Sequence, residues 1–269
     1  MSTILTIISL TTIPSRINLI EDTINSLLTQ LVPVYLWIPH YTAKTDTYYT
    51  LDQLPKWLTN RENLTVTLVE DLGSITKLIT ALALTESETI ITVDDDCIYP
   101  PHFVETLKKG MAQYHNQKAL CFRGKVLFTP YYRQAFSFRN VKKPRVVDIV
   151  TGVYGVAYQR QWFDIEKLTE MSKDFPGNDD IVISAYLDQK NIERLAIPFL
   201  GGESVTEDEG TKKVDSLWWS GNKKHRSKND EAIKALGLGK FSKIFIGRVL
   251  LWRNPFLRPT HLKKGVIRG

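Results

Sequence analysis

The hydrophobic positions along the first 200 residues follow two alternating spacings. Runs rich in Val, Ile, Leu and Thr predict four strands, at residues 3–9, 34–38, 64–69 and 89–93. Segments 17–30 and 75–84 instead carry apolar residues at helical spacing, whereas 45–59 fits either a helix or irregular chain. Strands and helices that alternate at short intervals are typical of an α/β protein with a mainly parallel sheet flanked by helices.

Beyond residue 100 the spacing changes, and a smaller β region is expected beside the main sheet. The pattern predicts helices at 101–114, 161–172 and 179–189, strands at 118–122 and 192–197, and extended segments at 126–129, 146–150 and 153–158. Gly152 and Gly155 lie in a stretch that reads as a strand. Glycines there allow close approach of a ligand or of neighbouring backbone, and simple packing is an equal alternative.

The last quarter of the chain differs in composition. Residues 201–230 are polar and poor in periodicity, which predicts a mobile loop, and helices are expected near 229–237 and 240–252. The sequence therefore divides into a main α/β domain, 1–200, and a mobile loop with a basic helical extension, 201–269.

Charge is unevenly distributed between these parts. The net charge is +6, but Lys212–Arg268 alone carries +12, so the first 211 residues carry −6. A basic tail suits membrane headgroups, a phosphorylated substrate or nucleic acid, and a solvated terminus is as good an explanation. With two cysteines outside any Cys/His cluster and no signal-peptide pattern at the start, we expect a cytoplasmic protein whose tail could contact the inner membrane face.

Three consecutive carboxylates, Asp94, Asp95 and Asp96, follow directly after the apolar strand 89–93. The ends of buried strands are where α/β sheets present their ligands. Like charges this close repel one another, so the position favours a hard cation such as Mg²⁺ or Mn²⁺ with phosphate oxygens completing its shell. The alternative is a solvated acidic turn, or an aspartate that caps the next helix.

A second acidic stretch begins the helix expected at 179–189. Asn178, Asp179 and Asp180 follow Pro176 and Gly177, which break the preceding chain. An N-cap and a favourable helix dipole explain at least one of these acids. The functional alternative is that one carboxylate faces the cleft and acts as a general base, and the choice between Asp179 and Asp180 stays open.

In the order of these parts, the first 200 residues resemble nucleotide-sugar glycosyltransferases of the GT-A fold, similar to family 2 enzymes. The residues that carry the likeness are the Ser9–Arg16 loop, the Asp71–Lys77 segment, the acidic triplet and the later acidic pair. The triplet matches the family's Asp-any-Asp motif. The resemblance implies a GT-A fold whose smaller β region lies on the acceptor side.

The resemblance also implies roles for individual residues. The nucleotide and its phosphates would be bound by Thr11, Pro14, Arg16, Asp71, Lys77, Asp94 and Asp95. Asp96, together with Asp94, would hold the divalent metal, and Asp180 matches the family's catalytic base. The loop with Trp218 and Trp219 is a candidate lid, in which His225 is either a further metal ligand or simply solvated.

The function that the resemblance implies is metal-dependent transfer of a sugar, with inversion expected. The donor would be a nucleoside diphosphate sugar, with a UDP-sugar favoured, and the acceptor a glycan or a lipid-linked molecule. A nucleotidyltransferase is the alternative enzyme, although the Ser9–Arg16 loop lacks the glycines of a phosphate-binding loop. A carbohydrate-binding or nucleic-acid-binding protein is the non-catalytic alternative, with nucleic acid the less favoured partner.

Overall fold

The structure, a computed structural model, describes residues 5–42, 46–59, 61–208, 210–211 and 223–239. An eight-stranded mixed sheet, mostly parallel, runs through the centre of the described chain in the order β11-β14-β8-β13-β6-β1-β2-β5. Its parallel half consists of β1 (Thr6–Thr11), β2 (Val34–Pro39), β5 (Leu64–Val69) and β6 (Thr89–Thr92). The α/β class and the four strands predicted in this half are confirmed.

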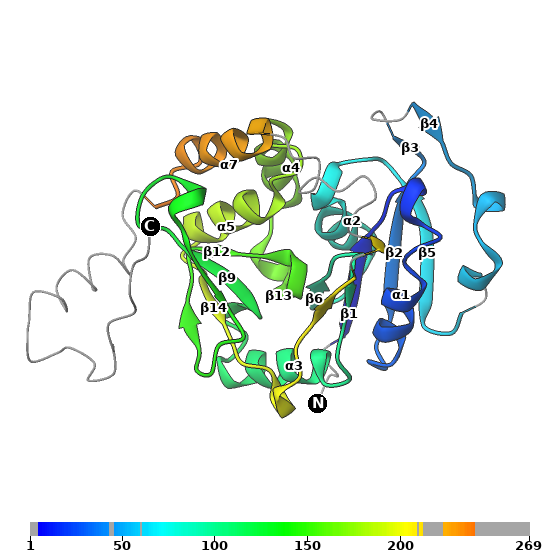
Figure 1. Cartoon of the computed structure of the whole chain (residues 1–269), viewed down its shortest axis with the longest axis horizontal. Coiled ribbons are helices and arrows are strands. Elements are labelled where there is room, and N and C mark those ends of the chain that lie inside the picture. Colours follow the sequence, from blue (N-terminus) through cyan, green and yellow to red (C-terminus); the bar gives the residue numbers. More distant parts are fainter. Residues whose placement is uncertain (1–4, 43–45, 60, 209, 212–222, 240–269) are drawn as a thin grey trace, which may run out of the picture.

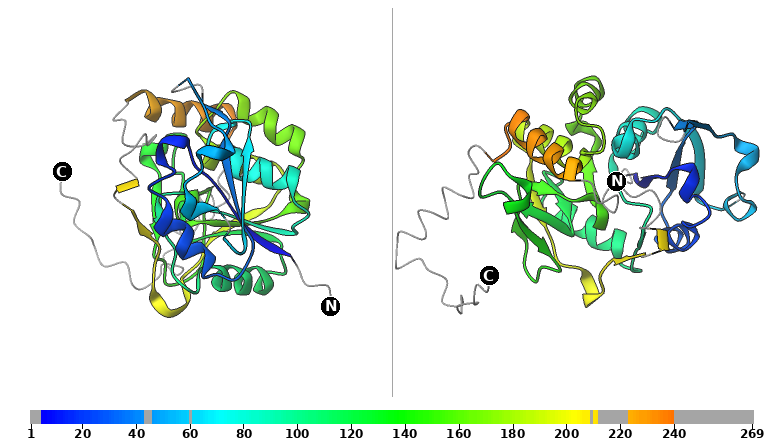
Figure 2. Two further views of the ribbon diagram at one scale, coloured as in Figure 1. Left: turned by 90° about the vertical axis from the view of Figure 1, so that its right-hand side faces the viewer. Right: turned by 45° about the horizontal axis from the view of Figure 1, so that its top comes forward.

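Helices cover both faces of this half because the chain reverses direction across the sheet. The described α-helices are α1 (Glu21–Leu28), α2 (Thr76–Leu84), α3 (Phe103–Gln113), α4 (Ile165–Lys173), α5 (Asp179–Gln189) and α7 (Lys223–Ala235). Figure 2 shows α2 and α4 on one side of the sheet and α1 and α3 on the other. The crossover through α1 leads from β1 outward to β2, whereas the one through α2 leads back from β5 to β6. With right-handed crossovers, opposite directions place the two helices on opposite faces.

One antiparallel strand joins the two halves of the sheet. β13 (Val156–Gln159) lies between β6 and β8 (Lys118–Cys121) and runs antiparallel to both. β14 (Glu193–Ala196) then pairs parallel with β8, and β11 (Arg145–Val146) closes the edge. Because β13 is antiparallel to β6, the residues before β13 lie beside the residues that follow β6. Segments far apart in sequence therefore meet at one edge of the sheet.

A smaller antiparallel sheet lies beside the main one, in the order β10-β9-β12. Its strands are β9 (Arg123–Val126), β10 (Phe136–Arg139) and β12 (Ile149–Val150). Two further pairs are short: β3 (Tyr41–Thr42) with β4 (Thr47–Tyr48), and β7 (Cys97–Ile98) with β15 (Thr206–Glu207). The smaller β region predicted from sequence is therefore present, with strand bounds that differ from the expected segments.

Several predicted elements need correction. Residues 152–154, expected in a strand, form a 3-10 turn that precedes β13. The segment 45–59 contains β4 and two short 3-10 turns instead of a long helix. The stretch 201–230, expected to be a loop, contains β15 and the first residues of α7, which begins at Lys223 instead of near 229. The second tail helix, expected at 240–252, lies outside the described residues.

The core follows from the buried strands. All four residues of β6 are buried, as are five of the six in β1. An apolar run covered on both faces is what a parallel sheet between two helical layers requires. Among the helices of the described chain, none is both long enough and apolar enough to cross a lipid bilayer.

Candidate functional site

A cluster of charged side chains lies where the sheet changes its direction of connection. β1 and β6 are neighbours, and their loops lead to opposite sides, so a crevice opens beyond their carboxyl ends. A cavity of about 620 Å³ occupies this position and is lined by both acidic stretches. That volume lies within the range of ligand pockets, roughly 300–1,000 Å³. The fold thus brings the two predicted constellations into one cavity.

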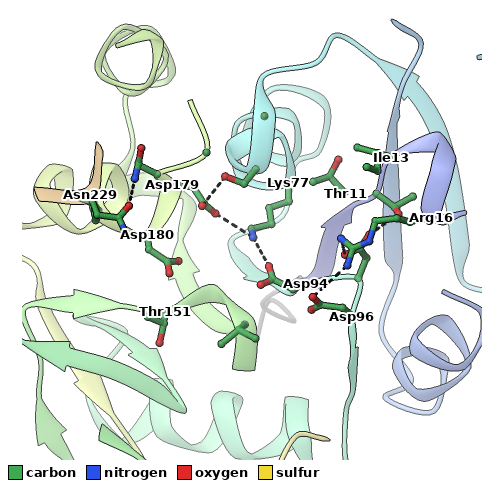
Figure 3. Close-up of a pocket in the computed structure, with 18 of the residues that line it drawn as sticks. Thr11, Ile13, Arg16, Lys77, Asp94, Asp96, Thr151, Asp179, Asp180 and Asn229 are labelled. Atoms are coloured by element: carbon green, nitrogen blue, oxygen red, sulfur yellow. Dashed lines mark hydrogen bonds and ion pairs between the residues drawn. The ribbon is translucent and has the colours of Figure 1, made fainter. Parts of the chain in front are cut away.

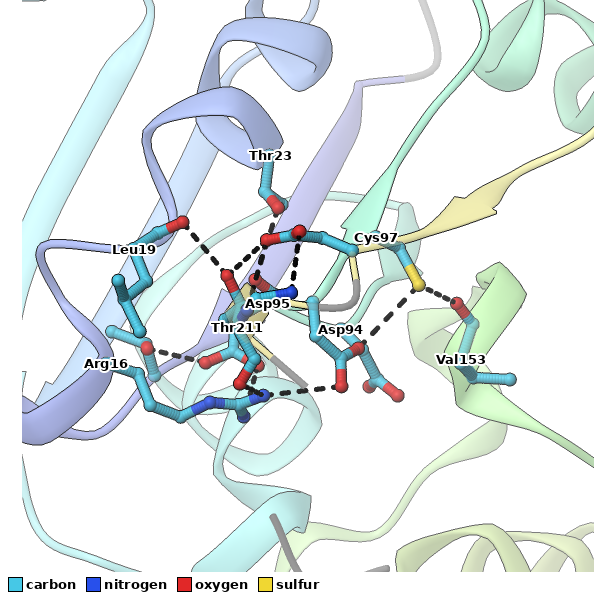
Figure 4. Close-up of polar contacts among 12 residues, drawn as sticks. Arg16, Leu19, Thr23, Asp94, Asp95, Cys97, Val153 and Thr211 are labelled. Atoms are coloured by element: carbon cyan, nitrogen blue, oxygen red, sulfur yellow. Dashed lines mark hydrogen bonds and ion pairs between the residues drawn. The ribbon is translucent and has the colours of Figure 1, made fainter. Parts of the chain in front are cut away.

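The central acid of the triplet holds two loops together. The Asp95 carboxylate accepts a hydrogen bond from the Thr12 hydroxyl at 2.6 Å and pairs with Arg16 at 2.7 Å, while its backbone oxygen accepts from Thr23. Figure 4 shows these contacts converging on the acidic turn. Burial raises the pKa of Asp95 to about 6, although Arg16 and Thr12 act to lower it. Asp95 therefore fixes the turn after β6 to the loop after β1.

Asp96 lies beside the same arginine and under a neighbouring chain segment. Arg16 reaches Asp96 at 3.3 Å and also donates to the backbone oxygen of Thr211 at 3.0 Å. The Asp208 amide donates to the backbone oxygen of Asp96 at 2.7 Å, so the segment after β15 crosses the acidic turn. Burial and the nearby Asp94 raise the pKa of Asp96, against the effect of Arg16. A cation beside this carboxylate would relieve both causes.

A buried lysine connects the two acidic turns. The Lys77 ammonium, on the first turn of α2, lies 2.5 Å from Asp94 and 3.1 Å from Asp179, as Figure 3 shows. Asp179 also accepts a hydrogen bond from the Ser74 hydroxyl at 2.7 Å. Burial alone would lower the pKa of Lys77, but the surrounding carboxylates outweigh it and raise the pKa well above its ordinary value. The lysine is therefore charged, and it links α2, the turn after β6 and the start of α5.

Asp180 differs from its neighbour because no cation pairs with it among the described residues. Its carboxylate accepts one hydrogen bond, from the Gly152 amide at 2.8 Å. Burial and the adjacent Asp179 raise its pKa to about 8. The pKa of Asp179 is lowered instead, because Lys77 and Ser74 outweigh the effect of burial. The structure thus separates the two acids: Asp179 is held as a carboxylate, whereas Asp180 takes up and releases its proton near pH 8.

Gly152 allows these groups to approach each other closely. A Cβ at this position would lie 3.3 Å from both the Asp180 carboxylate and the Lys77 ammonium, and 3.5 Å from Asp94. Three residues later, Gly155 has φ = +86°, and its amide donates to the Gly152 oxygen at 2.7 Å. The close approach expected of the two glycines is present, in a tight turn instead of a strand.

The fit of a divalent metal can be judged from the donors present. Within the described residues no group of three or more His, Cys, Asp or Glu side chains is arranged to hold an ion. Asp94 and Asp96 are two carboxylates on one turn that faces the cavity, and each is paired with one cation, Lys77 or Arg16. Mg²⁺ is commonly held by one or two carboxylates with phosphate oxygens and water supplying the rest. The donor set fits that mode of binding and does not form a cage made of protein ligands alone.

Of the other residues expected at the site, some line the cavity and some do not. Thr11 and Asp71 line the cavity, and Asp71 also accepts a hydrogen bond from the Gly73 amide at 2.8 Å. Pro14 begins a 3-10 turn and is not among the lining residues. The side chain of His225 lies outside the described residues, so the ligand role expected for it has no structural counterpart here.

The far wall of the cavity contains residues that the sequence did not single out. Arg123, Lys125 and Arg139 come from the small sheet, and Tyr132 and Thr151 lie beside them. Arg123 and Lys125 are two residues apart on β9, and Arg139 on β10 pairs in register with Arg123, so all three lie on one face. The pattern Arg-Gly-Lys on a short strand was the available signal. We call Arg123, Lys125 and Arg139 the basic wall.

Comparison with known proteins adds no family assignment. No protein-family model matches the sequence, and no curated protein matches it.

Proposed function

We propose that this protein transfers a sugar from a nucleoside diphosphate sugar to an acceptor hydroxyl, with Mg²⁺ or Mn²⁺ and with inversion. The observation that carries the proposal is the pairing of two acidic turns in one crevice. One turn, Asp94–Asp96, offers carboxylates at the sheet's switch point. The other offers Asp180, whose pKa of about 8 suits a general base. The likeness to GT-A enzymes noted from the sequence agrees with this division.

In the proposed reaction the acceptor oxygen attacks the anomeric carbon on the face opposite the diphosphate. The bond between that carbon and the diphosphate oxygen breaks, a new carbon–oxygen bond forms, and the acceptor proton moves to Asp180. The nucleoside diphosphate leaves with the electron pair. The transition state resembles an oxocarbenium ion, and a single base is sufficient for inversion.

The residues around the reacting groups have separate tasks in this scheme. Asp94 and Asp96 would hold the divalent cation, which when bound offsets charge on the leaving diphosphate. Lys77 keeps Asp179 ionised, and Asp179 in turn keeps the pKa of Asp180 high. Asp95 and Arg16 keep the turn in place. The loop that contains Thr11 would contact the nucleoside. If the basic tail beyond residue 200 binds a membrane face, the acceptor could be a lipid-linked molecule held there.

Calorimetry with UDP and GDP, in the presence and absence of Mn²⁺, tests the proposal directly. We expect one nucleoside diphosphate to bind more tightly with Mn²⁺, and chelation with EDTA to remove that gain. Asp96→Asn should lose most of the Mn²⁺ effect, whereas Glu105→Gln, an exposed acid on α3, should keep it. Absence of any nucleoside diphosphate binding would overturn the proposal.

Product analysis separates the proposed enzyme from the alternatives. A glycosyltransferase slowly hydrolyses its donor without acceptor and releases free sugar and nucleoside diphosphate. A nucleotidyltransferase would instead consume a nucleoside triphosphate and release pyrophosphate. A binding protein would retain nucleotide or sugar and form neither product.

A further inference from the structure

The basic wall lies opposite the acidic turns, and its charges are incompletely compensated. Arg123 pairs with Glu207 at 3.4 Å and lies 5.4 Å from the ring of Tyr154. Within the described part of the chain, no carboxylate pairs with the ammonium of Lys125 or the guanidinium of Arg139. Lys125 instead stands 4.6 Å from the centre of the Tyr132 ring. The wall therefore presents positive charge to the cavity with little to neutralise it.

Burial makes the positive charge of Lys125 unfavourable when no anion is bound beside it. Burial and the neighbouring Arg123 lower the pKa of Lys125, and Asp180 acts in the opposite sense. A bound anion would act as Asp180 does, only more strongly, because it could contact the ammonium directly. The influence of Asp180 also locates the wall on the side of the base, whereas the nucleotide is proposed to bind at the turn after β6.

A buried hydroxyl between the two sides has no hydrogen-bond partner among the described residues. Thr151 is 4% exposed and lines the cavity, and its Oγ1 forms no hydrogen bond with any described residue. Figure 3 shows Thr151 near Asp180 at the lower side of the cavity. Its amide donates to the Arg123 oxygen at 3.0 Å, so it is fixed to the basic wall. A buried hydroxyl without a partner is unfavourable, and a polar ligand held there would satisfy it.

We propose that the acceptor is an anionic sugar, in which a phosphate ester or carboxylate binds the basic wall while the accepting hydroxyl faces Asp180. This inference rests on the proposed sugar transfer and adds the chemical class of the acceptor. Thr151 donates or accepts a hydrogen bond with the same sugar unit. A neutral acceptor would leave the half-buried Lys125 ammonium without a counterion.

The test uses three probes that share one hexose frame and differ in charge: glucose, glucose 6-phosphate and glucuronic acid. Each is titrated by calorimetry into the full chain saturated with UDP and Mn²⁺, and separately into the protein alone. We expect at least one charged probe to bind about tenfold or more tighter than glucose. The two charged probes distinguish a phosphate-bearing acceptor from a uronic acid.

Matched variants assign the effect to the wall. Lys125→Met should remove most of the charge preference, and Lys125→Arg should retain it. Lys142→Met removes the same charge from an exposed position that does not line the cavity, so it should behave as the unsubstituted protein. Equal binding of all three probes, or equal loss with Lys142→Met, would refute the inference.

The design also separates this inference from the proposed function. If glucose 6-phosphate displaces UDP instead of binding beside it, the wall belongs to the donor diphosphate and the anionic acceptor is wrong. If the protein retains neither UDP nor GDP, the proposed function fails, while the titrations without nucleotide still report whether the wall selects anionic sugars.

Discussion

The two acidic turns have similar composition but opposite surroundings. In the turn after β6, the central Asp95 is tied to Thr12 and Arg16, and the flanking acids face the cavity. In the turn that starts α5, the first acid is tied to Lys77 and Ser74, and Asp180 has only a backbone amide. In both turns one aspartate holds the structure and its neighbour is left for a ligand or a proton. Pairing with a cation distinguishes the two acids only at the start of α5, because all three acids of the turn after β6 contact Arg16 or Lys77.

Substitution of Asp180 should have the largest effect on activity. Asp180→Asn removes the proposed proton acceptor without removing an ion pair, so transfer should fall roughly 10²–10⁴-fold while the fold is retained. Because the acid must be ionised to act, the rate of the unsubstituted protein should rise with pH, reach half of its maximum near pH 8 and level off above that. Initial rates between pH 5 and pH 9, with circular dichroism as the folding check, measure both effects.

The matched control is the neighbouring acid. Asp179→Asn removes a charge that raises the pKa of Asp180, so the rising part of the pH profile should move to lower pH. A profile that stays in place in Asp179→Asn, or near-normal transfer by Asp180→Asn, would contradict the assignment of the base.

Substitution of Lys77 should have the largest effect on stability. Lys77→Met leaves Asp94 and Asp179 without their common cation, and breaking a buried ion pair destabilises by about 3–5 kcal/mol. Lys109→Met removes a lysine from an exposed pair with Glu105 and should change the free energy of unfolding by about 0–1 kcal/mol. Urea unfolding of the two variants measures the difference. Similar losses would mean that the bridge contributes no more than a surface pair.

A smaller effect concerns stability and pH. The pKa of Asp180 in the folded protein is about 8, above the value of 3.8 for an unperturbed aspartate. Its contribution to stability is therefore full below about pH 4 and is lost as pH rises to about 8. Asp180→Asn removes this loss. Between pH 5 and pH 8 the free energy of unfolding of the variant should therefore rise by about 1 kcal/mol or more relative to that of the unsubstituted protein. Thermal unfolding of both proteins at pH 5 and at pH 8 measures the gain. If the difference in stability between the two proteins is the same at both pH values, the pKa of Asp180 is not raised.

Local sequence patterns predicted several helices and strands well. The strand at Leu64–Val69 and the helix at Asp179–Gln189 occur where periodicity placed them. These elements depend on residues close in sequence. The position of β13 does not, because pairing with both β6 and β8 is decided by contacts across more than thirty residues. Residues 152–154 form a turn because the chain must reverse before it enters that strand.

The part of the site that is formed by runs of acidic residues was predictable from the sequence. Asp94–Asp96 and Asp179–Asp180 are conspicuous in the sequence, and the structure places both in the cavity. Their division of tasks was not predictable, because it depends on Lys77 and Arg16 from distant elements. The basic wall was missed for a different reason: Arg139 is distant in sequence from Arg123 and Lys125 and joins them only through strand pairing.

The backbone at Gly155 has a consequence beyond its own position. Its φ of +86° is rarely adopted by other residues, and a Cβ there would lie 2.4 Å from the ring of Phe103. The same turn aims the Gly152 amide at Asp180. Any side chain introduced at 155 would therefore reorient the only hydrogen-bond donor that the described structure gives to this acid. Damage to proton transfer would originate at a residue that never meets the substrate.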